Sequence, residues 1–268
     1  MLTKANRIFF FLAALLLFSC HHNKSEKIFI PSSKKINHAR NYYKKAEKIN
    51  YSVQYGLLHI GNIVITTSAG VQQVDNIPCY HVKVNSKLSG ATGFVFSIND
   101  SWESFIDTSS LLPYKFGKSL QENKYHRTDY TIFDRIQEKA FVTNITNPAA
   151  PESNNYPITT NIEDMISSFF LLRNVPLENM KVNDTATIDA FVENRCFNIR
   201  IKLLGMEKIK ALSKKQKAYL ITTSVAGVES DEQVKCWISA DEKHIPLKVR
   251  VKLPLVAVEL ELKEYKSN

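Results

Sequence analysis

Three carboxylates stand close to a tryptophan in the first half of the chain. Asp100, Glu103 and Asp107 surround Trp102, and a carboxylate pair beside an aromatic ring is the group that cleaves glycosidic bonds when it is held at a suitable separation. Asp107, however, begins the run DTSS, a turn sequence in which Asp commonly accepts hydrogen bonds from nearby backbone. The turn interpretation is favoured, and we assign no catalytic residue.

Other catalytic and metal-binding motifs are absent from the sequence. It contains no G-x-S-x-G for a serine hydrolase, no H-x-x-x-H pair for zinc and no glycine-rich phosphate loop among its eight glycines. His21 and His22 are adjacent, and neighbouring side chains on an extended chain point in opposite directions. We therefore expect a non-enzymatic protein with no metal site and no cofactor.

The most specific chemical signal is the thiol of Cys20. Lys4 and Arg7 precede an apolar run from Ile8 to Phe18, which predicts an export signal because it is shorter than the roughly 20 residues that cross a bilayer. The run ends in LFSC, which resembles the lipobox of bacterial lipoproteins, although Phe18 is bulkier than the usual residue. The resemblance implies cleavage before Cys20 and attachment of palmitate-type chains. An ordinary cleaved signal and an uncleaved anchor are the alternatives.

These features divide the chain into residues 1–19 as signal peptide, 20–46 as a lipidated flexible tether and 47–266 as a single β-rich domain. The tether is rich in Lys, Arg and His and contains Pro31-Ser32-Ser33. The expected location is the bacterial cell envelope, with a lipid anchor in the outer membrane facing the periplasm. His21 mildly favours this location, since aspartate at that position retains some lipoproteins at the inner membrane.

Composition limits the range of partners. Hydrophobic residues make up 44% of the chain and charged residues 23%, which is typical of a globular protein with a core. The formal net charge is +9, but export argues against nucleic acid, so the expected partner is the membrane through its lipid anchor. Three cysteines besides Cys20 lie in strand-like runs: Cys79, Cys196 and Cys236. Buried free thiols are favoured for them, with one disulfide as the alternative.

Apolar residues alternate with polar ones through most of the chain after Ile49, which predicts antiparallel strands. The clearest case is the last stretch, where apolar residues occupy odd positions from Ile245 to Leu253 and even positions from Val256 to Leu262. This change of parity across Pro254 predicts a hairpin with one face toward the core. The run NITNPAAPESNNYPIT predicts a long surface loop instead.

The period changes to that of a helix at residues 161–173. Ile162, Met165, Ile166, Phe169 and Leu172 fall at spacings of three and four. Thr160 with Glu163 has the spacing of a capping box, and Asn174 followed by Pro176 would end the helix. We predict one helix whose apolar face packs on the sheet.

Four segments, in this order and spacing, resemble the bacterial domain-of-unknown-function family 3108 over Glu47 to Tyr265: EKINYSVQYGLLHIG, WESFIDTSSLLPYKF, IEDMISSFFLLRNVPL and WISADEKHIPLKVRVKL. The resemblance implies a mainly β fold, a strongly curved antiparallel sheet or half-open barrel of the lipoprotein-carrier kind with one packed helix, and no catalytic residue. It gives structural roles to Tyr51, Gly61, Asp107, Pro113, Asp164, Arg173, Asp241 and Pro246.

A sheet that curls without closing must cover its concave face. Five residues are candidates to line a pocket there or simply to fill the core: Phe94, Phe96, Phe169, Phe170 and Leu172. Arg173 and Asp164 are candidates for an ion pair, with Arg173 alternatively pairing a strand acid or an anionic headgroup. We expect a lipid or another apolar molecule as ligand; a docking or scaffold module for an envelope protein, and less readily an enzyme on an envelope substrate, are the alternatives.

Overall fold

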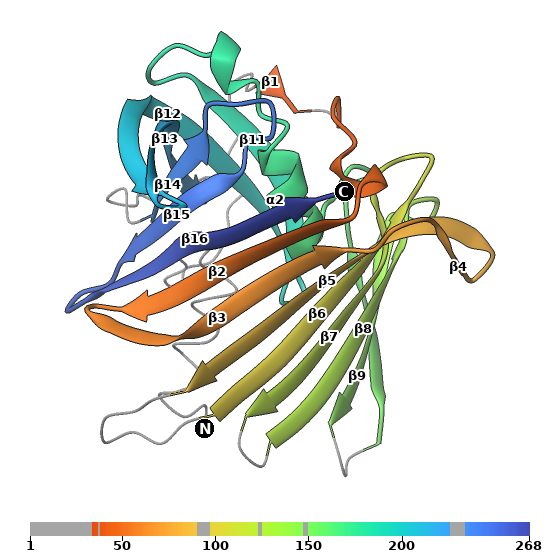
Figure 1. Ribbon diagram of the computed structural model, residues 1–268. Helices are drawn as coiled ribbons and strands as arrows, with labels where there is room; N and C mark the ends of the chain where they lie inside the picture. Colours follow the sequence, from red (N-terminus) through yellow and green to blue (C-terminus); the bar gives the residue numbers. More distant parts are fainter. Residues whose placement is uncertain (1–33, 37, 90–96, 123–124, 147–149, 226–233) are drawn as a thin grey trace.

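The computed structural model describes residues 34–268 except 37, 90–96, 123–124, 147–149 and 226–233. The described chain is mainly β with one α-helix, as expected (Figure 1). The first half contains β1 (Lys34–Lys35), the 3-10 turn η1 (Tyr42–Lys44), β2 (Glu47–Tyr55), β3 (Leu58–Thr67), β4 (Gln72–Val74), β5 (Ile77–Ser89), β6 (Ser97–Asp107), β7 (Pro113–Glu122) and β8 (Tyr125–Asp134). The second half contains β9 (Lys139–Thr146), β10 (Glu152–Pro157), α2 (Met165–Leu172), η2 (Leu177–Asn179), β11 (Thr185–Val192), β12 (Arg195–Ala211), β13 (Lys214–Val225), β14 (Val234–Ser239), β15 (Pro246–Lys252) and β16 (Ala257–Ser267).

All described strands belong to a single sheet. Its order is β1-β11-β12-β13-β14-β15-β16-β2-β3-β5-β6-β7-β8-β9-β10, with β4 paired to β5. Neighbours are antiparallel except β1, which runs parallel to β11. The two halves of the chain meet at β2 and β16, so the last strand pairs with the first long one.

The sheet curls into a half-open barrel (Figure 1). Near one end the two margins of the sheet approach each other. The ring of Phe133 on β8 meets that of Phe191 on β11 edge to face, with the centroids 5.9 Å apart. Ile158 and Ile162, which precede α2, fill the space between these strands. At the opposite end the strands β5 to β9 fan apart (Figure 1).

The helix α2 crosses the concave face near one end of the strands. Its first turn meets Ser104, close to the last residue of β6, and its last turn meets Glu47, the first residue of β2. We call this side of the sheet the helix end. We call the other side, where β2 finishes at Tyr55 and β16 begins at Ala257, the open end.

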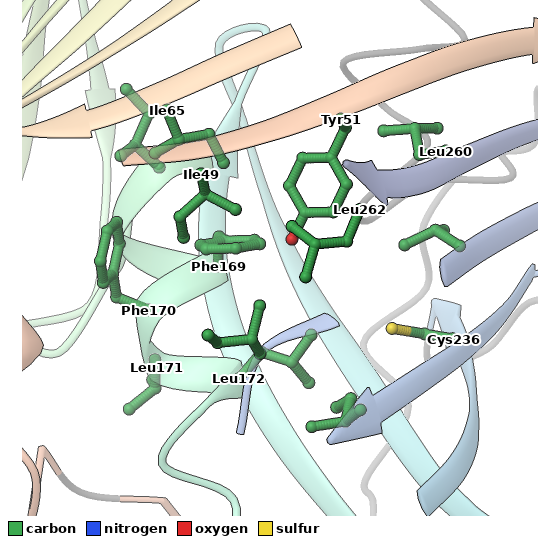
Figure 2. Close-up of a cluster of buried hydrophobic side chains, with 14 of the residues drawn as sticks. Ile49, Tyr51, Ile65, Phe169, Phe170, Leu171, Leu172, Cys236, Leu260 and Leu262 are labelled. Atoms are coloured by element: carbon green, nitrogen blue, oxygen red, sulfur yellow. The ribbon is translucent and has the colours of Figure 1, made fainter. Parts of the chain in front are cut away.

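The helix is buried on nearly every side. Seven of its eight residues are buried, all except Met165. Figure 2 shows Phe169 pointing from the helix toward Ile49 and Tyr51 on β2 and Leu262 on β16. A helix that is apolar all round belongs in a core rather than on a surface. The helix α2 therefore fills the interior of the half-barrel at this end and does not lie on the sheet with one face toward solvent.

The helix begins later than the sequence pattern suggests. The predicted capping box of Thr160 and Glu163 is wrong: Asp164 is the N-cap, and it forms a capping box with Ser167. Glu163 is held outside the helix because its backbone bonds the strand β11, donating to Asp189 O at 2.9 Å and accepting from Phe191 N at 2.8 Å.

The predicted loop 144–159 is wrong in part. Residues Glu152–Pro157 form β10, which pairs with β9 as an exposed margin of the sheet. An edge strand bonds on one side only, so it tolerates the polar composition and the proline at its end that argued for a loop. The predicted hairpin of the last stretch is confirmed, with Arg250 opposite Glu259 and Lys248 opposite Glu261.

Candidate functional site

The amino-terminal turn of α2 carries a buried carboxylate. Asp164 is 1% exposed, and its Oδ1 accepts from the amides of Ile166 and Ser167, each at 2.7 Å. The Ser104 hydroxyl donates to its Oδ2. Burial raises the pKa of Asp164 from its ordinary 3.8 to about 6, although these hydrogen bonds oppose the shift.

A second buried acid, Glu163, lies beside the first. Its Oε1 is 2.8 Å from Nε2 of His38, which comes from the segment before β2. Glu163 is 1% exposed, and its Oε2 bonds no described residue. No sequence motif connects these two residues, which stand 125 positions apart.

The carboxyl-terminal end of α2 is fixed by a buried ion pair. Arg173 is fully buried, and its Nη1 and Nη2 donate to Glu47 at 2.7 and 3.1 Å. Its Nε donates to Lys243 O at 3.1 Å, and its guanidinium lies 3.9 Å from the ring centroid of Tyr42. Tyr265 on β16 donates to the same carboxylate at 2.8 Å.

The predicted ion pair of Arg173 with Asp164 does not form, because the two residues lie at opposite ends of α2. Arg173 instead pairs with a strand acid, Glu47, which was the other interpretation of this arginine. Its burial inside the protein leaves it no access to an anionic headgroup.

The described part of the predicted tether packs against the domain. Lys34–Lys35 pair with β11, and Tyr43 is 2% exposed with its ring 4.8 Å from that of Phe170. Arg40 N donates to the Asn174 side chain at 2.7 Å. Residues 34–36 and 38–46 therefore form a strap across α2.

The candidate pocket residues on the helix lie in the core. Phe169, Phe170 and Leu172 are between 1% and 4% exposed and pack against the sheet (Figure 2). They fill the helix end of the half-barrel, which was the alternative interpretation. Phe94 and Phe96 lie outside the described residues, as does Cys20.

The apolar inner face continues beyond the reach of α2. The helix has eight residues and is about 12 Å long. Leu88 and Ile98 face each other across β5 and β6, six residues from the Ser104 contact, or about 20 Å at roughly 3.4 Å per residue. Leu120 on β7 continues this surface. On the other side of the half-barrel it includes Val234, Val251 and Val258. We call these six residues, each of which is 8% exposed or less, the inner wall.

Charged side chains lie next to the inner wall. Lys118 on β7 is 7% exposed and pairs with Asp129 at 3.6 Å and with Glu193 at 2.5 Å. Arg127 donates to Asp129 at 2.7 Å. On these strands Lys118 and Leu120 point to the same face, since alternate residues share one side, so the concave surface combines apolar and ionic groups.

The carboxylates around Trp102 do not converge. Asp100 is buried and accepts from the amide of Gln121 at 2.7 Å. Glu103, an odd-numbered residue of β6, points to the opposite face from Asp100. Asp107 caps the following turn by accepting from the amide and hydroxyl of Ser109 at 2.9 Å, which confirms the turn interpretation.

One outer-face network has the residue types of a hydrolase triad. Ser68 Oγ is 3.3 Å from His81 Nδ1, and His81 Nε2 is 3.2 Å from Glu103 Oε2. The Ser68 amide donates to His81 O at 2.9 Å, so it is not available to stabilise an oxyanion. Phe105 stacks on the imidazole at 4.6 Å. We interpret this network as a surface cluster that holds β3, β5 and β6 together.

The three described cysteines are free thiols. Cys79 and Cys236 are buried as expected, and burial raises their pKa values to about 11 and about 12. Cys196 differs, because it is exposed. The described residues contain no cluster of three or more possible metal ligands. No helix among them is long and apolar enough to span a bilayer.

The comparisons with known proteins agree with the family resemblance. The model of a protein family of unknown function, DUF3108, matches residues 50–263. The chain belongs to the DUF3108 family. The matched range includes α2, Arg173 and the hairpin of β15 and β16, but neither Glu47 nor the strap.

A solved structure supports the architecture. The chain resembles the crystal structure of a beta-barrel-like protein of the domain of unknown function DUF1849 from Brucella abortus, with a TM-score of 0.56 and 8% sequence identity. The likeness covers 84% of this chain and 98% of that one. At this identity it shows the fold alone. No curated protein matches the sequence.

Proposed function

We propose that this DUF3108 protein is a lipid-anchored protein of the bacterial envelope whose half-barrel binds the apolar part of a lipid or similar molecule. The observation that carries the proposal is the inner wall, since its apolar residues continue about 20 Å beyond α2 toward the open end. Binding sites for apolar ligands are concave surfaces of this composition with a few polar groups at fixed places.

The ionic group beside the inner wall suits an amphipathic ligand. Lys118 on β7 is two residues from Leu120, and on β8 Arg127 lies opposite Leu120 and Asp129 lies opposite Lys118. A ligand with a charged or polar head could exchange hydrogen bonds with this group while its chain contacts Leu88 and Ile98. The proposal assigns no catalytic step to any residue.

The anchor is the second part of the proposal. The apolar run before Cys20 and the LFSC sequence support export and acylation, and two or more acyl chains hold a protein stably at a membrane. Cys20→Ala is expected to release the protein into the soluble fraction of the envelope. If the variant still fractionates with membrane, the lipidation proposal is wrong.

The binding proposal is tested with a fluorescent fatty-acid analogue and two matched variants. Leu120→Trp adds bulk to the inner wall, whereas Phe141→Trp changes an outer-face residue that is 37% exposed. We expect the first variant to weaken binding of the analogue at least tenfold and the second to leave it unchanged. Equal binding by both variants and the wild type would contradict a ligand on the inner wall.

Protein docking is a second candidate, and β10 supports it. This strand is an edge of the sheet with five of its six residues exposed, and an exposed edge can accept a further strand from a partner. A stoichiometric envelope protein captured by the wild type, and lost when Asn154→Pro blocks the edge, would favour docking.

A further inference from the structure

Two neighbouring hairpin tips project apolar side chains at the open end. The tip between β2 and β3 carries Leu57 and Leu58, which are 101% and 50% exposed, and the tip between β15 and β16 carries Leu255, which is 99% exposed. The tips are adjacent because β2 pairs with β16, and Gly56 N donates to Ala257 O at 2.9 Å. Figure 1 shows them side by side.

Cations lie beside these leucines. A hollow of about 440 Å³ at the second tip is lined by Lys235, Arg250 and Lys252 together with Leu253, Pro254 and Leu255. Arg250 pairs with Glu259 at 3.2 Å, whereas Lys235 and Lys252 form no ion pair with a described residue. Among the described residues, the surface at the second tip is therefore both apolar and positive.

Another exposed turn provides a contrast. Ile136, in the turn between β8 and β9 at the helix end, is 97% exposed. It stands alone in the turn Asp134-Arg135-Ile136-Gln137-Glu138, whose charges are mixed. Exposure of one apolar residue in a turn needs no explanation. Exposure of several leucines on adjacent tips, beside cations, does need one.

We propose that these two tips dock on an anionic lipid surface, with Leu57 and Leu255 in the interfacial region of the bilayer. Apolar side chains flanked by Lys and Arg are the composition of surfaces that bind anionic membranes. Leu57 and Leu255 are fully exposed and project from the tips. Projecting side chains fit a deformable lipid surface, whereas the energetic centres of protein interfaces are buried in pockets.

The proposed lipid anchor and the tips can reach the same bilayer. Cys20 and Lys34 are 14 residues apart in the sequence, which spans at most about 46–50 Å when fully extended. The strand β6 has 11 residues and is about 37 Å long, so the spacer can cover the height of the half-barrel. The open end would then face the membrane. This docking does not depend on a ligand at the inner wall.

The test places a reporter at one tip of the full chain. Leu255→Trp and, as the control, Ile136→Trp are mixed with vesicles of phosphatidylethanolamine and phosphatidylglycerol that contain a brominated, tryptophan-quenching lipid. We expect a blue shift and quenching for the substitution at position 255 only, and loss of both when Lys235→Glu and Lys252→Glu are added. Vesicles of phosphatidylcholine should give at least tenfold weaker binding of the tip.

Three results would overturn the proposal. One is no response at position 255, and another is an equal response at positions 255 and 136. The third is a response that appears only when an envelope protein is added, which would identify a protein partner. Binding of the fatty-acid analogue by the variant with Lys235→Glu and Lys252→Glu is measured in parallel. This measurement distinguishes failure of membrane docking from failure of the inner-wall site.

Discussion

The buried pair of Arg173 and Glu47 makes the most quantitative prediction about the architecture. Arg173 joins four parts of the chain, because it contacts Glu47 on β2, Lys243 O after β14 and the ring of Tyr42 in the strap from its own position after α2. Arg173→Met would leave the Glu47 carboxylate buried, with Tyr265 as its one remaining side-chain partner among the contacts described above.

Removal of one member of a buried ion pair costs about 3–5 kcal/mol of unfolding free energy, because the remaining charge is uncompensated. For a chain of this size we expect the melting temperature to fall by roughly 6–20 °C. The control is Arg250→Met, since Arg250 is 55% exposed and pairs with Glu259 at the surface. Its loss should cost no more than about 1 kcal/mol.

Urea unfolding of four chains measures this effect: wild type, Arg173→Met, Glu47→Gln and the double variant. The loss of unfolding free energy in the double variant is expected to be smaller than the sum of the two single losses, because no buried charge is left without a partner. If Arg173→Met costs no more than Arg250→Met, or if the two losses simply add, the pair does not hold the helix end together.

Three further predictions concern other parts of the domain. Asp164→Asn keeps an N-cap acceptor but removes a group whose pKa is raised to about 6. Because the folded state binds this proton more tightly than the unfolded state, the unfolding free energy of the wild type should fall by up to about 3 kcal/mol as the pH rises from 4 to above 6. The difference in unfolding free energy between wild type and variant should change with pH in the same way. A difference that stays constant with pH would refute this. Gly61→Ala should destabilise the protein several times more than Gly70→Ala, for which about 1 kcal/mol is expected. A Cβ at Gly61 would stand 2.0 Å from Lys87 O, while no described atom lies within 4 Å of a Cβ at Gly70. Equal losses of unfolding free energy in urea would contradict this. A thiol reagent should label Cys196 in the folded protein and leave Cys79 and Cys236 unmodified until the protein unfolds, since Cys196 is exposed and the other two are buried. Equally fast labelling of all three would show that the sheet opens.

The sequence pattern was sufficient for the strands with alternating burial. The hairpin of β15 and β16 was predicted correctly, because polar and apolar residues change parity at one proline. Local signals of this kind need no tertiary information.

The sites formed by distant segments could not be predicted in the same way. Nothing local to His38, Arg40 or Tyr43 indicates that they pack on α2, since their partners lie more than 100 residues away. The helix start was misplaced for a related reason, because Glu163 bonds β11 instead of entering the helix. The inner wall was missed because apolar–polar alternation along a strand identifies its buried face but does not show how much of that face the helix α2 covers.

The most direct test of the central claim is lipid analysis of the native protein. After gentle extraction, mass spectrometry of the intact complex followed by denaturation separates covalent acyl chains from molecules held by the half-barrel. We predict about one non-covalently bound lipid or similar apolar molecule per chain, lost in Leu120→Trp and kept in Phe141→Trp. A wild-type protein that carries its acyl chains and no other apolar molecule would contradict the account.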